Sequence, residues 1–136
     1  MHFFKQILVR RIPLTGLLMG VFLIAGCSSG PVNIPDTISP AELVQRAQEA
    51  SDRNRYKQAL GYYEAIRERF PENDEYGCTA EYEIAFIHYK QKKYDLSVSE
   101  FRSLLDRYDQ PDAELLPPQY RILANIVIDR IDRRKK

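Results

Sequence analysis

The chain has 136 residues, with 20 basic and 19 acidic side chains and a formal net charge of +1. A balance this even gives no pronounced basic surface, so nucleic acid is not an expected partner. Because the whole sequence contains only two cysteines and two histidines, we expect a small domain that is not an enzyme and that holds neither a metal ion nor a cofactor.

The first 26 residues have the layout of a secretory signal peptide. Lys5, Arg10 and Arg11 come before a mostly apolar run over residues 12–25, and this opening contains no acidic side chain. A membrane-spanning helix needs about 20 apolar residues, whereas this run has 14. We therefore predict a cleaved leader over residues 1–26.

The leader ends in Ile24-Ala25-Gly26-Cys27, where a plain signal peptide has an A-x-A cleavage site. This ending resembles the bacterial lipobox. The resemblance implies that the chain is cut before Cys27 and that a lipid such as palmitate is attached to the Cys27 thiol, and two or more acyl chains anchor a protein firmly. The other interpretations are a plain signal peptide with an accidental cysteine and a short buried helix.

Three parts are thus predicted: the signal peptide over residues 1–26, the lipidated cysteine with a flexible linker over residues 27–39, and a helical domain over residues 40–136. Two prolines, one glycine and no periodicity indicate the linker.

The domain begins with the signals of a helix N-terminus. Ser39 is the expected N-cap, and Glu42 is expected to complete a capping box with it. Pro40 suits the first helical turn, while Ile38 can pack on Leu43 as a hydrophobic staple.

From residue 40 onward the sequence has helical periodicity and no strand alternation, which predicts an all-α fold. Residues 55–71 align without a gap on residues 93–109, at an offset of 38. The matched pairs are Tyr56 with Tyr94, Ala59 with Ser97, Tyr63 with Phe101, Ile66 with Leu104, Arg69 with Arg107 and Phe70 with Tyr108. Self-similarity at this spacing is typical of a helical repeat array.

The two units resemble tetratricopeptide repeats, in which a small residue in the first helix is followed by A-x-x-x-F in the second. Ala47, Ala59 and Tyr63 fit this pattern in the first unit, and Ala85 and Phe101 fit it in the second. The resemblance implies a tetratricopeptide-like array of two helix pairs. The alternative is an unrelated bundle of helical hairpins.

Two further expectations concern the ends of the second unit. A repeat of 38 residues exceeds the usual 34 by four, and we place the extra residues in the PENDEYG turn at residues 71–77. After Pro117-Pro118, one helical face carries Tyr120, Leu123, Ala124, Val127, Ile128 and Ile131. This segment is predicted to cover the second pair as a C-terminal capping helix, which makes five helices.

A binding surface is better supported than an active site. Tyr82, Phe86 and Tyr89 recur at spacings of four and three, so they share one stripe of a helix. In tetratricopeptide repeats this stripe tends to line the concave groove, and Val44 and Gln48 fall on the matching stripe of the first unit. An equally supported alternative is that the final helix covers the three rings, which then belong to the hydrophobic core.

The remaining candidates have structural interpretations. Cys78 is expected to be a small apolar residue near a helix start, and His88 a packed or half-buried side chain. The basic tail contains Arg130 and Arg133, which suit the C-terminus of a helix and alternatively contact an acidic partner surface or anionic headgroups.

A lipobox, a short linker and repeats of the type Y-x-x-A-x-x-x-Y with a closing R-F-P resemble the BamD family, over about residues 23–109. The resemblance implies a lipid-anchored scaffold on the periplasmic face of a bacterial outer membrane. Its expected partners are the barrel-assembly protein subunit or unfolded outer-membrane proteins. The alternative is an adaptor lipoprotein for a transporter, pilus or cell-wall system, because other tetratricopeptide lipoproteins share these motifs.

Overall fold

A computed structural model describes residues 33–136 of the chain. Over these residues it contains five α-helices and one short 3-10 helix and no strand, in the order α1 (Pro40–Asp52), α2 (Tyr56–Arg69), α3 (Asp74–Lys90), α4 (Tyr94–Arg107), η1 (Ala113–Leu115) and α5 (Pro118–Arg134). The predicted all-α fold is confirmed. The predictions for residues 1–26 and for Cys27 fall outside the described residues.

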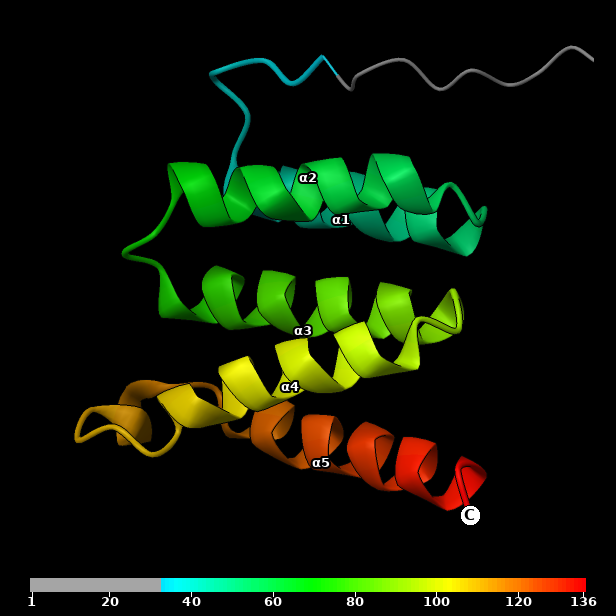
Figure 1. Cartoon of the computed structure of the whole chain (residues 1–136). Helices are drawn as coiled ribbons and strands as arrows, with labels where there is room; N and C mark the ends of the chain where they lie inside the picture. Colours follow the sequence, from blue (N-terminus) through cyan, green and yellow to red (C-terminus); the bar gives the residue numbers. More distant parts are fainter. Residues whose placement is uncertain (1–32) are drawn as a thin grey trace, which may run out of the picture.

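The helices form a helical repeat array. Figure 1 shows α1 paired with α2, α3 paired with α4, and α5 lying against α4 at the far end of a single stack. The core has two parts: one between α1, α2 and α3, centred on Leu43 and Tyr63, and one between α3, α4 and α5, centred on Phe101 and Ile131. The prediction of two helix pairs and a C-terminal helix over the second pair is therefore confirmed.

The sequence repeat is also a repeat of backbone geometry. The turn inside each helix pair contains one residue with positive φ, Asn54 at 56° and Lys92 at 63°. After it, the amide of Arg55 donates to the Ala50 carbonyl at 2.8 Å, and the amide of Lys93 donates to the His88 carbonyl at 2.9 Å. Each pair of equivalent residues is 38 apart, so both units close their helices with the same turn.

The four extra residues of the repeat lie within residues 71–77, as predicted, but they are helical and do not belong to a turn. They form the first turn of α3, which begins at Asp74, whereas the position equivalent to the start of α1 is Cys78. The side chain of Asn73 accepts a hydrogen bond from the Tyr76 amide at 3.1 Å. Acidic residues follow in the first turn, where they interact favourably with the helix dipole, and this capping extends the helix backward into the predicted turn.

The start of α1 agrees with most of its sequence signals. Ser39 accepts from the Glu42 amide at 3.2 Å, and Ile38 is buried in the same core cluster as Leu43. The Glu42 carboxylate, which was expected to complete a capping box, accepts from Arg46 at 2.6 Å. This ion pair along the helix occupies the side chain that the box would have used.

The end of the predicted linker packs against the helices. Arg69, in the last turn of α2, donates to the carbonyl oxygens of Pro35 and Ile34 at 2.9 and 3.2 Å. Ile34 also packs on the first core cluster. We call this contact the Arg69 clamp, and it attaches the segment before α1 to the C-terminal end of α2.

Tyr63→Phe is expected to raise the free energy of unfolding by about 1 kcal/mol. The Tyr63 side chain is fully buried, and among the described residues its hydroxyl has no hydrogen-bond partner. Burying an unsatisfied hydroxyl costs about 1–3 kcal/mol, and removing it without changing the ring avoids that cost. Phe101 occupies the equivalent position in the second unit. Urea unfolding followed by circular dichroism measures the difference.

The matched control is Tyr56→Phe, because the Tyr56 hydroxyl donates to the Asn54 side chain at 2.6 Å. This variant is expected to be no more stable than the wild type. A gain of equal size in both variants would contradict the explanation from Tyr63 burial.

Candidate functional site

A continuous row of aromatic rings follows α3 and extends onto the neighbouring helices. The rings of Tyr82 and Phe86 are stacked with centroids 5.8 Å apart, and those of Phe86 and Tyr89 are stacked at 5.7 Å. Tyr120 of α5 adds a ring beside Tyr82 at 5.4 Å. At the other end, Tyr94 of α4 lies 5.8 Å from Tyr89. The three rings predicted to share a stripe do so, and two further rings lengthen the row.

The row changes from core to surface along its length. Tyr82 is 8% exposed and belongs to the second core cluster, where its ring lies 5.5 Å from that of Phe101. Burial, together with the nearby carboxylate of Glu83, raises the pKa of the Tyr82 hydroxyl to about 12. Phe86 and Tyr89 pack on the same cluster but remain half-buried. Thus Tyr82 is core, while Phe86 and Tyr89 are partly exposed.

A lysine lies beside the accessible part of the row. The Lys90 ammonium is 5.4 Å from the centroid of Phe86 and 5.2 Å from that of Tyr56 on α2. It also donates to the Ser51 hydroxyl of α1 at 2.5 Å. We name Phe86, Tyr89 and Lys90 the aromatic strip, because they combine two partly exposed rings with a positive charge on one helix.

The other residues predicted to bind a partner are more scattered. Val44 is half-buried against the first core cluster, and Gln48 is exposed on α1. Arg130 and Arg133 are exposed on α5, and Arg130 is near enough to Tyr82 for its charge to lower the pKa of that hydroxyl, against the larger effect of burial. The structure therefore brings Tyr82, Phe86 and Tyr89 together, and it leaves Val44 and Gln48 outside the ring contacts.

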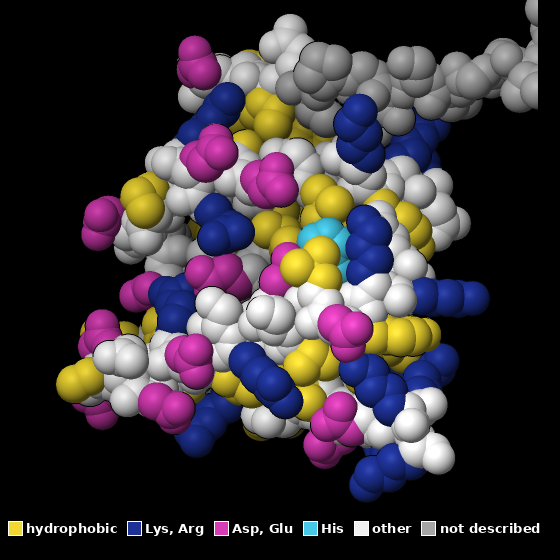
Figure 2. Space-filling model, in the orientation of Figure 1, with side chains coloured by type: hydrophobic (Ala, Val, Ile, Leu, Met, Phe, Trp, Pro, Cys, Tyr) yellow, Lys and Arg dark blue, Asp and Glu magenta, His cyan; other side chains and the backbone are white. Residues whose placement is uncertain are grey.

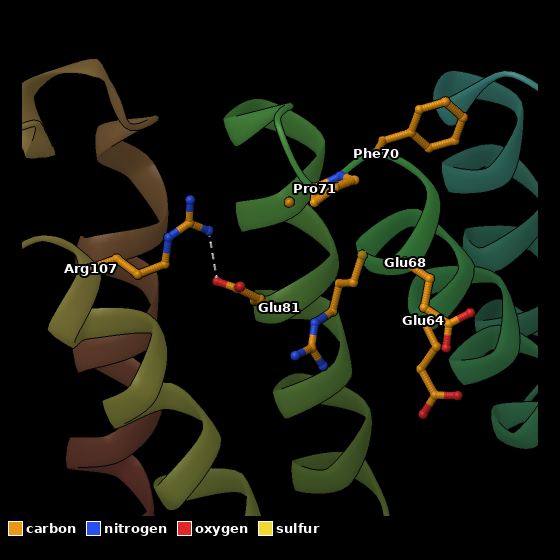
Figure 3. A pocket seen from close by; sticks show the side chains of 8 residues that line it. Glu64, Glu68, Phe70, Pro71, Glu81 and Arg107 are labelled. Carbon is orange, nitrogen blue, oxygen red and sulfur yellow. Dashed lines mark hydrogen bonds and ion pairs between the residues drawn. The ribbon is translucent and has the colours of Figure 1, made fainter.

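A polar cleft of about 530 Å³ lies between α2, α3 and α4. Figure 3 shows Arg107 extending from α4 toward Glu81 of α3, with Glu64 and Glu68 along α2. The guanidinium of Arg107 donates to Glu81 at 3.0 Å and to Asp74 at 2.6 Å. The charge of Arg107 is therefore already paired. The cleft mainly contains the ion pairs that hold the start of α3 against α4.

The two side chains with potential for covalent or acid–base chemistry are both in structural positions. Cys78 is fully buried, and burial raises the pKa of its thiol, which disfavours the reactive thiolate. His88 is 12% exposed, and its Nδ1 lies 2.7 Å from a carboxylate oxygen of Glu100, so it joins α3 to α4. Within residues 33–136 no cluster of three His, Cys, Asp or Glu side chains has the arrangement of a metal site.

Glu83→Gln is expected to raise the free energy of unfolding at pH 7. Burial raises the pKa of the Glu83 carboxyl above its ordinary 4.5, Asp52 adds to the rise, and Lys90 opposes it. Because the folded chain holds the proton more tightly than the unfolded chain, the wild type gains stability as the pH falls through the folded pKa. The advantage of the variant should therefore disappear below about pH 4, where both chains are neutral at this position.

Thermal unfolding at pH 7 and at about pH 3.5 tests this expectation, with Glu64→Gln as an exposed control on α2. An equal advantage at both pH values, or the same advantage in the control, would contradict the role given to burial.

Comparison with known proteins adds a distant relationship. No protein-family model matches the chain, and no solved structure matches it. A protein of Treponema pallidum (strain Nichols), described as uncharacterized, is 34% identical over 116 residues, which is 84% of this chain. The chain spans 46% of that protein's length. Within the described residues, no helix has the length and apolar character needed to cross a membrane.

Proposed function

We propose that this protein is a lipid-anchored periplasmic scaffold of the machinery that assembles outer-membrane β-barrel proteins. Its partner would be the barrel-assembly subunit or unfolded barrel proteins. The aromatic strip is the observation that carries the proposal, because partly exposed rings in a fixed row are suited to an apolar peptide segment. The lipobox-like sequence at Cys27 and the resemblance of the repeats to the BamD family supply the location and the machinery.

The strip suits recognition because little of it must reorganise on binding. Phe86 is stacked between Tyr82 and Tyr89, and Tyr89 lies between Phe86 and the tilted ring of Tyr94. A partner would therefore meet side chains that have already lost most of their freedom. Burying the remaining apolar edges contributes about 25 cal/mol per Å². Lys90 adds a positive charge for a carboxylate or a carbonyl oxygen at the rim, so an aromatic-rich segment with an acidic group is the partner that fits best.

Crosslinking in intact cells tests the proposal. A photoreactive residue in place of Phe86 samples the strip, and another in place of Arg133 samples the basic end of α5. Capture of the barrel-assembly subunit or of unfolded barrel proteins at Phe86 is the expected result. Capture of a transporter, pilus or cell-wall protein instead would favour the adaptor function, and it would contradict the assembly role.

A pair of alanine variants distinguishes the strip from apolar surface in general. With the photoreactive residue kept at Phe86, Tyr89→Ala is expected to lower capture of the partner about tenfold, since aromatic anchors commonly contribute 1–2 kcal/mol or more. Leu96→Ala removes an apolar side chain that is 45% exposed on α4 and should leave capture unchanged. An equal loss of capture in both variants would contradict the role given to the aromatic strip.

The anchor is tested separately. Cys27→Ala should move the protein from the membrane fraction to the soluble periplasmic fraction and abolish incorporation of labelled palmitate. Retention in the membrane with no label would show that the leader acts as something other than a lipoprotein signal.

A further inference from the structure

The last helix presents an apolar surface that no other described residue covers. Its inner face is packed through Ala124, Val127 and Ile131, which are at most 4% exposed. On the outer side, Ile122 is 62% exposed, Ile126 44% and Leu123 39%. We name Ile122, Leu123 and Ile126 the α5 patch. Three exposed aliphatic side chains on adjacent helical positions differ from the single exposed apolar residues that are ordinary on protein surfaces.

The α5 patch occupies a position around its helix that resembles a packed face of α3. Ile84 and Ile87 direct α3 toward the preceding pair, and Ala124 and Val127, each 40 residues later, do the same for α5. At this offset Ile122 and Ile126 correspond to Tyr82 and Phe86, which pack on the elements that follow α3. Ile122 and Ile126 therefore occupy helix-packing positions, whereas Leu123 corresponds to Glu83.

A second copy stacked head to tail would not complement this face. The opposite end of the array is formed by α1 and α2 (Figure 1). The exposed side of α1 carries the Glu42–Arg46 ion pair and a hydrogen bond between Gln45 and Glu49. Covering these polar side chains with Ile122 and Ile126 would remove them from water without new partners, which is unfavourable.

The charges around α5 favour association with the α5 helix of a second copy in the antiparallel direction. Before the helix, Asp109, Asp112 and Glu114 are exposed, and Arg121 is exposed in its first turn. In the last turns and the tail, exposed Arg130, Arg133, Arg134 and Lys136 outnumber exposed Asp129 and Asp132, so this end keeps a net positive charge. Figure 2 shows acidic side chains gathered over the segment that precedes α5, and basic side chains mixed with acidic ones toward its C-terminal end. Two such helices side by side oppose like charges when parallel and unlike charges when antiparallel.

We propose that two copies of this chain associate through an antiparallel pair of α5 helices, with the α5 patches in contact. In this arrangement the acidic segment that precedes α5 in one copy lies toward the basic C-terminal end of α5 in the other. The contact is isologous, so it closes at two chains. A single helix pair gives a small, weak interface, and confinement of both copies to one membrane would raise their effective concentration.

The full-length protein in its native membrane provides the test. A photoreactive residue in place of Leu123 should crosslink two copies that carry different tags. Ile126→Asp is expected to lower the yield of this dimer about tenfold, equivalent to about 1.4 kcal/mol. Leu96→Asp places the same charge on an exposed leucine of α4 and should leave the yield unchanged. Ile126 is exposed, so circular dichroism of both variants should match the wild type.

Exchange of charge tests the antiparallel register. Glu114→Lys should lower the dimer yield about two- to fivefold, as expected for an exposed ion pair, and addition of Arg134→Glu to the same chain should restore it. Three results would overturn the proposal: no crosslink between copies, crosslinking at Leu123 only to a different protein, or no effect of Ile126→Asp. Failure of the Arg134→Glu exchange to restore the yield would overturn the antiparallel arrangement.

Discussion

Replacing Phe101 with alanine is expected to lower the free energy of unfolding by about 3–5 kcal/mol, as for other buried phenylalanines. Phe101 is fully buried in α4, and its ring lies 5.5 Å from that of Tyr82. The second core cluster joins α3, α4 and α5 through a small number of side chains, so little can move in to fill the cavity. Because small domains are stable by about 5–15 kcal/mol in total, this loss is a large fraction.

Urea unfolding followed by circular dichroism measures the effect, and Leu96→Ala on the same helix is the control. Leu96 is 45% exposed, so its truncation should cost less than about 1 kcal/mol. Hydrogen exchange adds a spatial test, because Phe101→Ala should reduce protection in α3, α4 and α5 more than in α1. Uniform loss over all helices would contradict the division of the core into two parts.

Ala85→Leu is expected to lower the free energy of unfolding by about 1–3 kcal/mol through overpacking. Ala85 is fully buried where α3 meets α4. Across this contact the Ser97 hydroxyl donates to the Ala85 carbonyl at 2.8 Å, which holds the two backbones close together. Three more carbon atoms would separate the helices and break that hydrogen bond.

The control for this variant is Ala41→Leu, at an exposed position of α1. Leucine and alanine have similar helix propensities, so the control should change stability by less than about 0.5 kcal/mol. Thermal unfolding of both variants checks the expectation, and a tolerant Ala85→Leu would mean that α3 and α4 can separate at little cost.

The architecture could be predicted from sequence because several local signals agreed with one another. The offset of 38 between Tyr56 and Tyr94, or between Arg69 and Arg107, is reproduced in the first and last residues of α2 and α4. Apolar periodicity identified the buried side of α5 in part. Ala124, Val127 and Ile131 are buried as expected, whereas Leu123, predicted on the same face, is 39% exposed because it lies at the edge of that face. Such patterns depend on neighbouring residues along one helix, and sequence records these directly.

The parts that could not be predicted depend on contacts between distant helices. The spacing of Tyr82 and Phe86 is the same whether α5 covers both rings or only one, and in the structure Tyr82 is buried while Phe86 is half-buried. Lys90 reaches rings on α2 and α3, which its place in the sequence does not indicate. The equivalent residue of the first unit, Asp52, is also charged. A comparison of the two units could therefore have indicated a charged side chain beside the aromatic stripe.

The Arg69 clamp limits how far the folded domain can move from the bilayer if Cys27 carries the proposed lipid. Since Ile34 and Pro35 are held by Arg69, only the six residues 28–33 separate the anchor from the helices. Fully extended, six residues reach about 20 Å. The clamp sits at the α1–α2 end of the stack (Figure 1), so this end is kept close to the lipid headgroups. Force applied through the anchor would act first on the last turn of α2. Arg69→Ala would release Ile34 and Pro35, and so lengthen the segment between the anchor and the helices.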